Sequence, residues 1–240
     1  MRDVLIIPFN GKESIVVACD NSGGIGLKEL DAVQVPYDTV AYYSFRVAVM
    51  ECLAAGGNPF AVTLQNFCGE ASWNELLLGI NRGVAELGLK YLQITGSTES
   101  NFPLVQSAVG LTVLGKKKTS HKDLLPHFTD GTRIAVIGKP LVGDEVIENE
   151  TEVVPLSIFK LLCVLEDAIL LPVGSKGIFH ELNGLFSNRT FIDTEIISDL
   201  DIYKSSGPST CVLAVSNKKK MRDIMRVAGS YYYEIDVIEC

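Results

Sequence analysis

Short apolar runs alternate along the chain with longer segments whose apolar residues recur at helical spacing. The runs predict strands at Val4–Phe9, Ile15–Cys19, Phe60–Phe67, Tyr91–Thr95, Val105–Leu114, Arg133–Gly138, Ala168–Leu171, Thr210–Ser216 and Tyr232–Ile238. The longer segments predict helices at Tyr37–Ala55, Ser72–Leu87, Pro155–Glu166, Ile178–Phe186 and Lys218–Val227. This alternation is typical of a mixed α/β protein.

Two of the predicted helices have clear ends. The segment 37–55 follows Pro36 and stops at Gly56-Gly57, and the segment 72–87 ends at Gly88. Proline fits the first turn of a helix because its missing N–H would have no partner there, and glycine adopts the left-handed conformation that ends many helices. Both helices are therefore predicted from local chemistry alone.

Charge, proline and glycine gather in "GKKKTSHKDLLPHFTDG" (115–131), and the α/β alternation resumes beyond it. We expect two domains, residues 1–115 and 132–240, joined by a linker at 116–131. The chain shows no internal repeat and no low-complexity segment.

Composition excludes several classes of protein. A net charge of −8 is not the basic footprint of a nucleic-acid binder, and the lysine runs 116–118 and 218–220 read as solvated charge. The six cysteines are scattered without a CxxC pair, which argues against zinc and disulfides. Acidic residues interrupt the longest apolar span, "LLCVLEDAILLPVG", and the N-terminal apolar run is too short for a signal peptide. We expect a soluble cytoplasmic protein that binds neither membrane nor nucleic acid.

The segment "ACDNSGGIG" (18–26) turns abruptly small and polar behind a predicted strand. Glycines allow close backbone approach, and their exposed N–H groups can cradle an anion. Asp20 is placed to hold a divalent cation, and Lys28 to meet a phosphate. The segment is neither a dinucleotide-binding fingerprint nor a Walker loop, so an ordinary polar turn remains an alternative.

Three further stretches carry candidate chemistry. "TGSTESNFP" (95–103) gathers hydroxyls and Glu99 at a strand end, with a capped loop as the alternative. Glu51 lies inside an otherwise apolar helical pattern and could simply face solvent. In "PVGSKGIFHEL" (172–182), Lys176 stands at a predicted helix start that favours anions, or else is a solvated lysine after a capping serine.

In this order, the segments resemble the superfamily of aminoimidazole ribonucleotide synthetase, thiamine-monophosphate kinase, selenophosphate synthetase and the hydrogenase maturation protein that dehydrates a carbamoyl group. The resemblance covers essentially the whole chain, through "VVACDNSGGIGLK", "FRVAVMECLAAGGNP", "LQITGSTESNFP" and "DGTRIAVIGKPLVGDEV". The residues "ACDNSGGIG…ECLAAG…ITGSTESNFP" are most similar to those of the short α-ribazole kinase (α-ribazole-5-phosphate synthase) branch.

The resemblance implies an N-terminal ATP-binding domain that pairs with its twin in a homodimer, with strands of both subunits forming a β-barrel at the interface. A reduced C-terminal α/β domain closes over the acceptor. The implied activity is ATP- and Mg²⁺-dependent phosphorylation of the 5′-hydroxyl of α-ribazole to α-ribazole 5′-phosphate, in salvage of the cobalamin lower ligand. Alternatives are a thiamine-phosphate kinase or another ATP-dependent synthetase of the superfamily, and a non-catalytic nucleotide-binding regulatory protein.

The residues assigned on this basis fall into three groups. Lys176 and Asp20 are the expected catalytic residues, and Asp20, Glu51 and Glu99 the expected metal-supporting carboxylates. The expected nucleotide-binding residues are Asp20, Asn21, Gly23, Gly24, Gly26, Lys28, Gly96, Ser97, Thr98, Gly174, Ser175 and Gly177. Two departures from the family pattern keep the regulatory alternative open: Ser97 stands where the family carries an acid, and Lys176 where kinase members carry aspartate.

Overall fold

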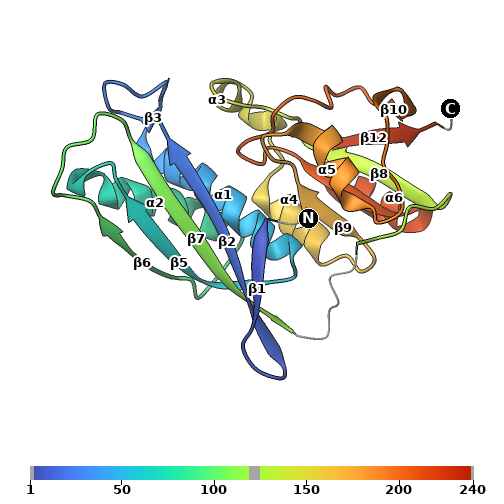
Figure 1. Ribbon diagram of the computed structural model, residues 1–240, viewed down its shortest axis with the longest axis horizontal. Coiled ribbons are helices and arrows are strands. Elements are labelled where there is room, and N and C mark those ends of the chain that lie inside the picture. Colours follow the sequence, from blue (N-terminus) through green and yellow to red (C-terminus); the bar gives the residue numbers. More distant parts are fainter. Residues whose placement is uncertain (1–2, 119–124, 239–240) are drawn as a thin grey trace. The chain divides into compact units, whose positions relative to one another are not determined.

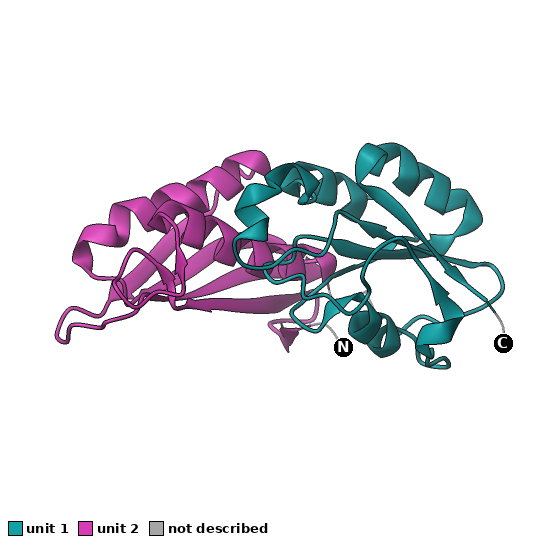
Figure 2. Cartoon of the chain, turned by 90° about the horizontal axis from the view of Figure 1, so that it is seen from above, with its two compact units in different colours: residues 1, 122–240 teal, residues 2–121 magenta. Residues whose placement is uncertain are grey.

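The computed structural model describes residues 3–118 and 125–238, which divide into two compact units (Figure 1, Figure 2). The first, here the N-terminal unit, comprises residues 2–121, and the second, the C-terminal unit, comprises residues 122–240 together with Met1. Residues 119–124 of the predicted linker lie outside the described residues, and Lys116–Lys118 at its start are the end of strand β7.

The N-terminal unit is built on a five-stranded sheet in the order β1-β2-β7-β5-β6. Its strands are β1 (Val4–Pro8), β2 (Glu13–Gly23), β7 (Ala108–Lys118), β5 (Asn58–Asn66) and β6 (Gln93–Thr98). All neighbours are antiparallel except β5 and β6, which are parallel because α2 (Trp73–Glu86), preceded by the short helix Glu70–Ser72, crosses over between them. A two-stranded ladder, β3 (Ile25–Gly26) with β4 (Val33–Gln34), precedes helix α1 (Tyr37–Ala54).

Helices α1 and α2 lie on the same face of this sheet (Figure 2). Burial along β2 alternates accordingly: Val16 and Ala18 are fully buried beneath α1, whereas Val17 between them is only partly covered. We call the second face of the sheet the outer face. Close packing fixes the helices, because a Cβ at Gly79 of α2 would lie 2.0 Å from the Asp38 carbonyl oxygen at the start of α1.

The C-terminal unit contains a second five-stranded sheet, entirely antiparallel, in the order β10-β12-β8-β11-β9. Its elements are β8 (Thr132–Ile137), α3 (Glu145–Glu148), the short helix Glu150–Glu152, α4 (Leu156–Cys163), β9 (Ile169–Pro172), α5 (Gly177–Leu185), the short helix Asp193–Glu195, β10 (Ile196–Ile197), β11 (Val212–Asn217), α6 (Lys218–Ala228), the short helix Gly229–Tyr231 and β12 (Tyr232–Val237).

Both faces of the C-terminal sheet are covered. Ile134 and Val136 of β8 belong to an apolar cluster that includes Leu182 of α5, while α6 packs against β8 and β11 and also against α4. All four residues from 134 to 137 are therefore buried. This explains why β8 reads as a continuous apolar run whereas β2 alternates.

The predicted helices and strands are all present, with shifted ends. Strand β2 continues to Gly23 and β6 to Thr98, four and three residues beyond the predicted ends, because neighbouring strands extend their hydrogen-bonded ladders through these polar residues. Strand β7 begins at Ala108 rather than Val105, and α4 ends at Cys163 rather than Glu166. No helix among residues 3–118 and 125–238 has the length and hydropathy needed to span a membrane.

Candidate functional site at the polar end of the N-terminal sheet

The strand register brings the polar segments of the N-terminal unit to one end of its sheet. Asn21 of β2 is opposite Gly110 of β7, Gly110 is opposite Gln65 of β5, and Gln65 is opposite Ser97 of β6. We call this region the polar end: residues 20–23 of β2, 108–110 of β7, 65–66 of β5 and 96–98 of β6. Residues 20–23 and 96–98, more than seventy residues apart in sequence, thus lie at the same end of the sheet.

The outer face at the polar end is hydrophilic and uncharged. A second row of facing residues, Cys19, Thr112, Thr63 and Thr95, lies next to the row just described. Within these rows the Gln65 amide donates to Thr63 Oγ1 at 3.2 Å, and Cys19 Sγ lies 3.3 Å from Thr112 Oγ1. Side chains of this kind offer hydrogen bonds to a ligand without a fixed charge.

Asp20 faces the opposite way, toward α1. It follows Val16 and Ala18 on the helix-facing side of β2, and it accepts hydrogen bonds from the Ser44 hydroxyl and the Asn21 backbone N–H. Burial is the largest influence on this carboxyl and raises its pKa from 3.8 to about 6, although both hydrogen bonds act in the other direction. A carboxylate that is costly to ionise in the folded chain is a candidate for a functional site.

The glycine segment after β2 is held tightly against residues 105–107. The Gly24 N–H donates to the Ser107 carbonyl oxygen at 2.8 Å, and Gly24 and Gly26 have φ values of 69° and 154°. A Cβ at Gly26 would lie 2.5 Å from Ser107 Oγ and 2.8 Å from the Tyr37 ring. Glycine is therefore required at position 26 by close approach of other protein atoms.

Lys28 uses its ammonium group within the unit. Nζ donates to the carbonyl oxygens of Phe67 at 2.9 Å and Gln106 at 3.3 Å. An ammonium group carries three donors, so one remains for an anion.

Sequence reasoning missed the buried carboxylate beside Lys28. Asp31 is 8% exposed and accepts hydrogen bonds from the backbone N–H groups of Ser107 and Lys28 and from the Ser107 hydroxyl. Burial alone would raise its pKa, but these hydrogen bonds and the Lys28 charge outweigh that effect and lower it. The only sequence signal was an acidic residue just before the apolar pattern of 32–35.

The second polar stretch is organised by Asn66. Its side-chain Nδ2 donates to Thr98 Oγ1 at 3.1 Å, and its backbone carbonyl oxygen accepts from the Glu99 N–H at 2.8 Å. Gly96 faces α2, where a Cβ would lie 2.9 Å from the Trp73 ring, whereas Ser97 is exposed on the outer face. The Glu99 carboxylate accepts from the Asn101 N–H at 2.7 Å and so caps its own loop.

Glu51 is buried in α1 rather than solvent-facing, at 8% exposure. Glu51 lies seven residues beyond Ser44, the hydrogen-bond partner of Asp20. At 1.5 Å per residue, this separation is about 10 Å along the helix. Glu99 is farther away, because β2 and β6 are three strand spacings apart, roughly 14 Å.

These separations bear on the expected Mg²⁺ site. Within residues 3–118 and 125–238, no three side chains of His, Cys, Asp or Glu are grouped so that one ion could bind them. Asp20, Glu51 and Glu99 therefore do not form a shared set of ligands in the isolated chain. Mg²⁺ is commonly held by one or two carboxylates together with substrate phosphates, and Asp20 fits that more limited role.

In the C-terminal unit, the segment Gly174–Gly177 leads into α5. Lys176 is the N-cap residue of the helix and is exposed, with no side-chain capping hydrogen bond. Gly177 has a φ of 80°, and a Cβ there would lie within 2.9 Å of the carbonyl oxygens of Tyr203 and Lys204. The segment thus packs directly on the chain near residue 204.

The loop Lys204–Thr210, "KSSGPST", is a second feature that sequence reasoning missed. The Ser206 N–H donates to the Gly174 carbonyl oxygen at 3.1 Å, which places the two small-residue loops side by side. Lys204 forms an ion pair with Glu145 of α3 at 2.8 Å. Ser206 and Thr210 are buried and hydrogen-bonded to each other at 2.8 Å, so this loop is well ordered internally.

The fold of the chain is also found in solved structures of other proteins. Over 99% of the chain, the fold matches PurL from T. maritima complexed with ADP (TM-score 0.63, 13% identity). It also matches HypE of the HypE–HypF complex (0.63, 12%, 99% of this chain) and AaThiL complexed with AMPPCP and TMP (0.65, 11%, 99% of this chain).

The chain spans 42% of the PurL chain, 88% of the HypE-complex chain and 84% of the AaThiL chain. No protein-family model matches the sequence, and neither does any curated protein. At these identities the matches show the fold. They confirm the expected mixed α/β fold, while the dimer barrel and the α-ribazole branch stay predictions.

Proposed function

We propose that this protein is an ATP- and Mg²⁺-dependent kinase that phosphorylates the 5′-hydroxyl of α-ribazole. The observation that carries the proposal is the polar end of the N-terminal sheet, in a fold that matches AaThiL complexed with AMPPCP and TMP over nearly the whole chain. The choice of α-ribazole rests on the amino-acid sequence of the segments 18–26, 51–56 and 94–103, which resembles the α-ribazole kinase branch.

Phosphoryl transfer needs alignment of the reactants and neutralisation of charge, and little covalent chemistry from the protein. Bound Mg²⁺ would neutralise part of the phosphate charge. Asp20 is the carboxylate we assign to support it, with Glu51 and Glu99 as more distant acids. The backbone of Gly23, Gly24, Gly26 and residues 96–98, and the remaining Lys28 donor, are assigned to the nucleotide.

Lys176 is assigned the catalytic charge of the C-terminal unit. It stands at the N-terminus of α5, where the helix dipole and its own ammonium both favour an anion. Its exposure leaves its ammonium accessible to a substrate. Gly174, Ser175 and Gly177 would provide the surrounding backbone.

The outer face supports the proposal of a homodimer. Its middle is apolar, with Leu5 at 61% and Ile7 at 44% exposure and Val17 and Leu114 only partly covered; Lys116, opposite Ile15, lies beyond them. An apolar sheet face of this kind is typically covered by another layer, and a second copy would supply one. A stable monomer in sedimentation at micromolar concentration would contradict this assignment.

The test is a phosphotransfer assay of the purified full-length protein with ATP, Mg²⁺ and a panel of α-ribazole, thiamine phosphate and formylglycinamidine ribonucleotide. We expect turnover with α-ribazole, and loss of Mg²⁺-dependent ATP binding in Asp20→Asn but not in the matched control Glu75→Gln on the exposed side of α2. Turnover with another acceptor would indicate a different synthetase or kinase. ATP binding without turnover would indicate a regulatory protein.

A further inference from the structure

Asp31 ties the segment that follows β2 to the start of β7. Its Oδ1 accepts from the Ser107 N–H at 2.7 Å, and its Oδ2 accepts from the Lys28 N–H at 2.8 Å and the Ser107 hydroxyl at 2.7 Å. Hydrogen bonds to an ionised acceptor are stronger than neutral ones, and three of them converge here on one buried group.

Lys28 completes the connection from its other end. Its ammonium reaches the carbonyl oxygens of Phe67, just past β5, and Gln106, while the Gln106 amide donates to the Leu30 carbonyl oxygen at 2.7 Å. The loop 24–35 is thereby fixed to residues 105–107 and to the end of β5. We call this set of bonds the Asp31 brace.

The brace acts on backbone that directly adjoins the polar end, at Gly24, Gly26 and Ser107. Ser107, its central partner, accepts the Gly24 N–H and is in van der Waals contact with Gly26, where no Cβ fits. Two glycines at positive φ have little conformational preference of their own. Their conformation must therefore be imposed by neighbours, and Asp31 is the charged neighbour that holds Ser107 in place.

We propose that Asp31 is a positioning residue that sets the backbone of Gly23–Gly26 for nucleotide binding. The proposal rests on the proposed function, in which this segment contacts ATP. Asp31 is buried and acts through Ser107 and the two glycines, without touching the nucleotide itself. Misplacement of a binding backbone by about 1 Å is enough to cost roughly a hundredfold in kcat/KM.

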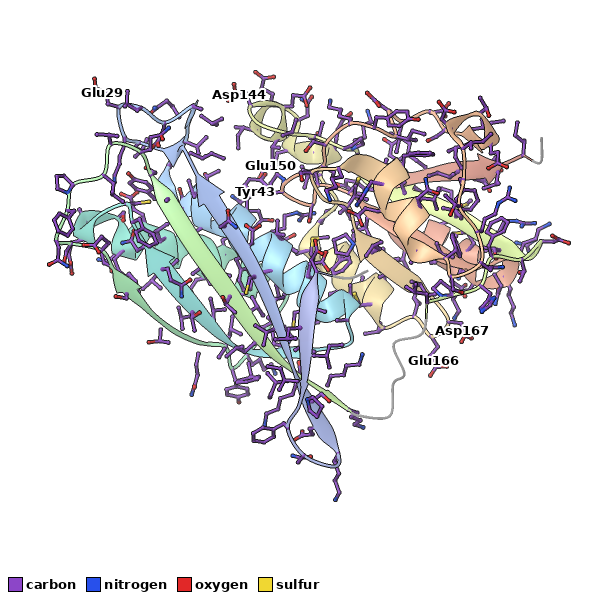
Figure 3. All side chains as sticks on the ribbon, viewed as in Figure 1. Glu29, Tyr43, Asp144, Glu150, Glu166 and Asp167 are labelled. Carbon is purple, nitrogen blue, oxygen red and sulfur yellow. The ribbon has the colours of Figure 1, made fainter. Side chains whose placement is uncertain are left out.

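The test compares Asp31→Asn with Glu29→Gln. Asparagine keeps one acceptor oxygen but turns an NH₂ group toward the N–H or hydroxyl donors, so the brace is broken with almost no change in volume. Glu29 is exposed on the same loop, at its outer tip in Figure 3, and its variant removes the same charge without touching the brace. The measurements are KM for ATP, kcat, nucleotide affinity, and hydrogen exchange of residues 24–35.

We expect Asp31→Asn to raise KM for ATP and the nucleotide dissociation constant roughly ten- to hundredfold. kcat at saturating ATP should change much less, and exchange should be faster in residues 24–35. Glu29→Gln should match the wild type in all four measurements. An unchanged KM in Asp31→Asn, or equal losses in the two variants, would overturn the proposal.

Two further results also decide the proposal: a variant that does not fold and a wild type that binds no ATP. If Asp31→Asn does not fold, Ser107→Ala removes the hydroxyl bond of the brace. Tyr37→Phe is its control, because it removes only the 3.2 Å hydrogen bond that the Ser107 hydroxyl also shares with Tyr37. Ser107→Ala should raise KM severalfold more than Tyr37→Phe does; an unchanged KM in Ser107→Ala overturns the proposal. If the wild type binds no ATP, the proposed function fails, and the nucleotide role of Asp31 fails with it. The wild-type measurement alone shows this result, so it is distinguished from a failure of the Asp31 proposal.

Discussion

Replacing Asp20 by asparagine should stabilise the N-terminal unit at neutral pH while removing the group assigned to Mg²⁺. The carboxyl has a pKa of 3.8 when exposed and about 6 in the folded chain, because burial beneath α1 disfavours its charged form. The folded state therefore binds this proton more tightly than the unfolded state. Stability consequently falls as pH rises from about 4 to about 6, and the loss is complete above that range.

The size of the effect follows from the same values. Since one pKa unit is worth 1.36 kcal/mol, the difference between 3.8 and about 6 corresponds to about 3 kcal/mol. Asparagine carries no ionisable proton and can still accept the Ser44 hydrogen bond. At pH 4 the carboxyl of the unfolded chain is already more than half ionised, so part of this difference is lost below pH 4. The free energy of unfolding of Asp20→Asn minus that of the wild type should therefore increase by about 2.4 kcal/mol between pH 4 and pH 7.

The assay is equilibrium urea unfolding at pH 4, 5, 6 and 7, followed by fluorescence of Trp73. This is the single tryptophan of the chain, and it lies in α2 of the N-terminal unit, so its signal reports on the unit that contains Asp20. Glu75→Gln, on the exposed side of α2, is the control and should remain within about 0.5 kcal/mol of the wild type. A difference between Asp20→Asn and wild type that does not change with pH, or that has the opposite sign, would refute the reasoning.

Three further predictions test the packing and the catalytic assignment. Gly79→Ala should cost about 1–3 kcal/mol in the Trp73 assay, because its Cβ would lie 2.0 Å from a backbone oxygen of α1; unchanged stability would contradict the α1–α2 packing. Leu182→Ala should cost about 2–5 kcal/mol in urea unfolding followed by circular dichroism, since this side chain is fully buried in the C-terminal cluster; a loss below 1 kcal/mol would indicate a looser core. Lys176→Ala should lower kcat by roughly 10²–10³-fold with ATP affinity nearly intact, and wild-type turnover would return Lys176 to the solvated-surface interpretation.

Sequence reasoning located the candidate segments but not their geometry. It placed Asp20 at a strand end before a polar turn, whereas β2 continues to Gly23 because β7 extends the ladder alongside it. Which face Asp20 presents depends on register, since a shift of one residue moves a side chain to the opposite face of a sheet. The sequence also could not show that Glu51 is buried.

Asp31 illustrates the limit most clearly. Its partner Ser107 is 76 residues away, and nothing in the local sequence distinguishes a buried acid with three hydrogen bonds from an exposed one. Lys28 likewise read as a phosphate ligand, whereas two of its three donors contact backbone carbonyls of other segments. Long-range polar contacts of this kind leave no periodic signal.

By itself, the sequence determined the order and type of the longer helices and strands, because periodicity, Pro36, Gly56-Gly57 and Gly88 act within a few residues of the backbone they control. It predicted neither the β3–β4 ladder nor α3 and β10. The tertiary structure alone decided that the polar residues of β2 and β6 lie at one end of a sheet, that Asp20 is desolvated beneath α1, and that Asp31 bonds to Ser107 beside the glycine segment. These features depend on strand register and burial, and both are set by contacts between residues far apart in the chain.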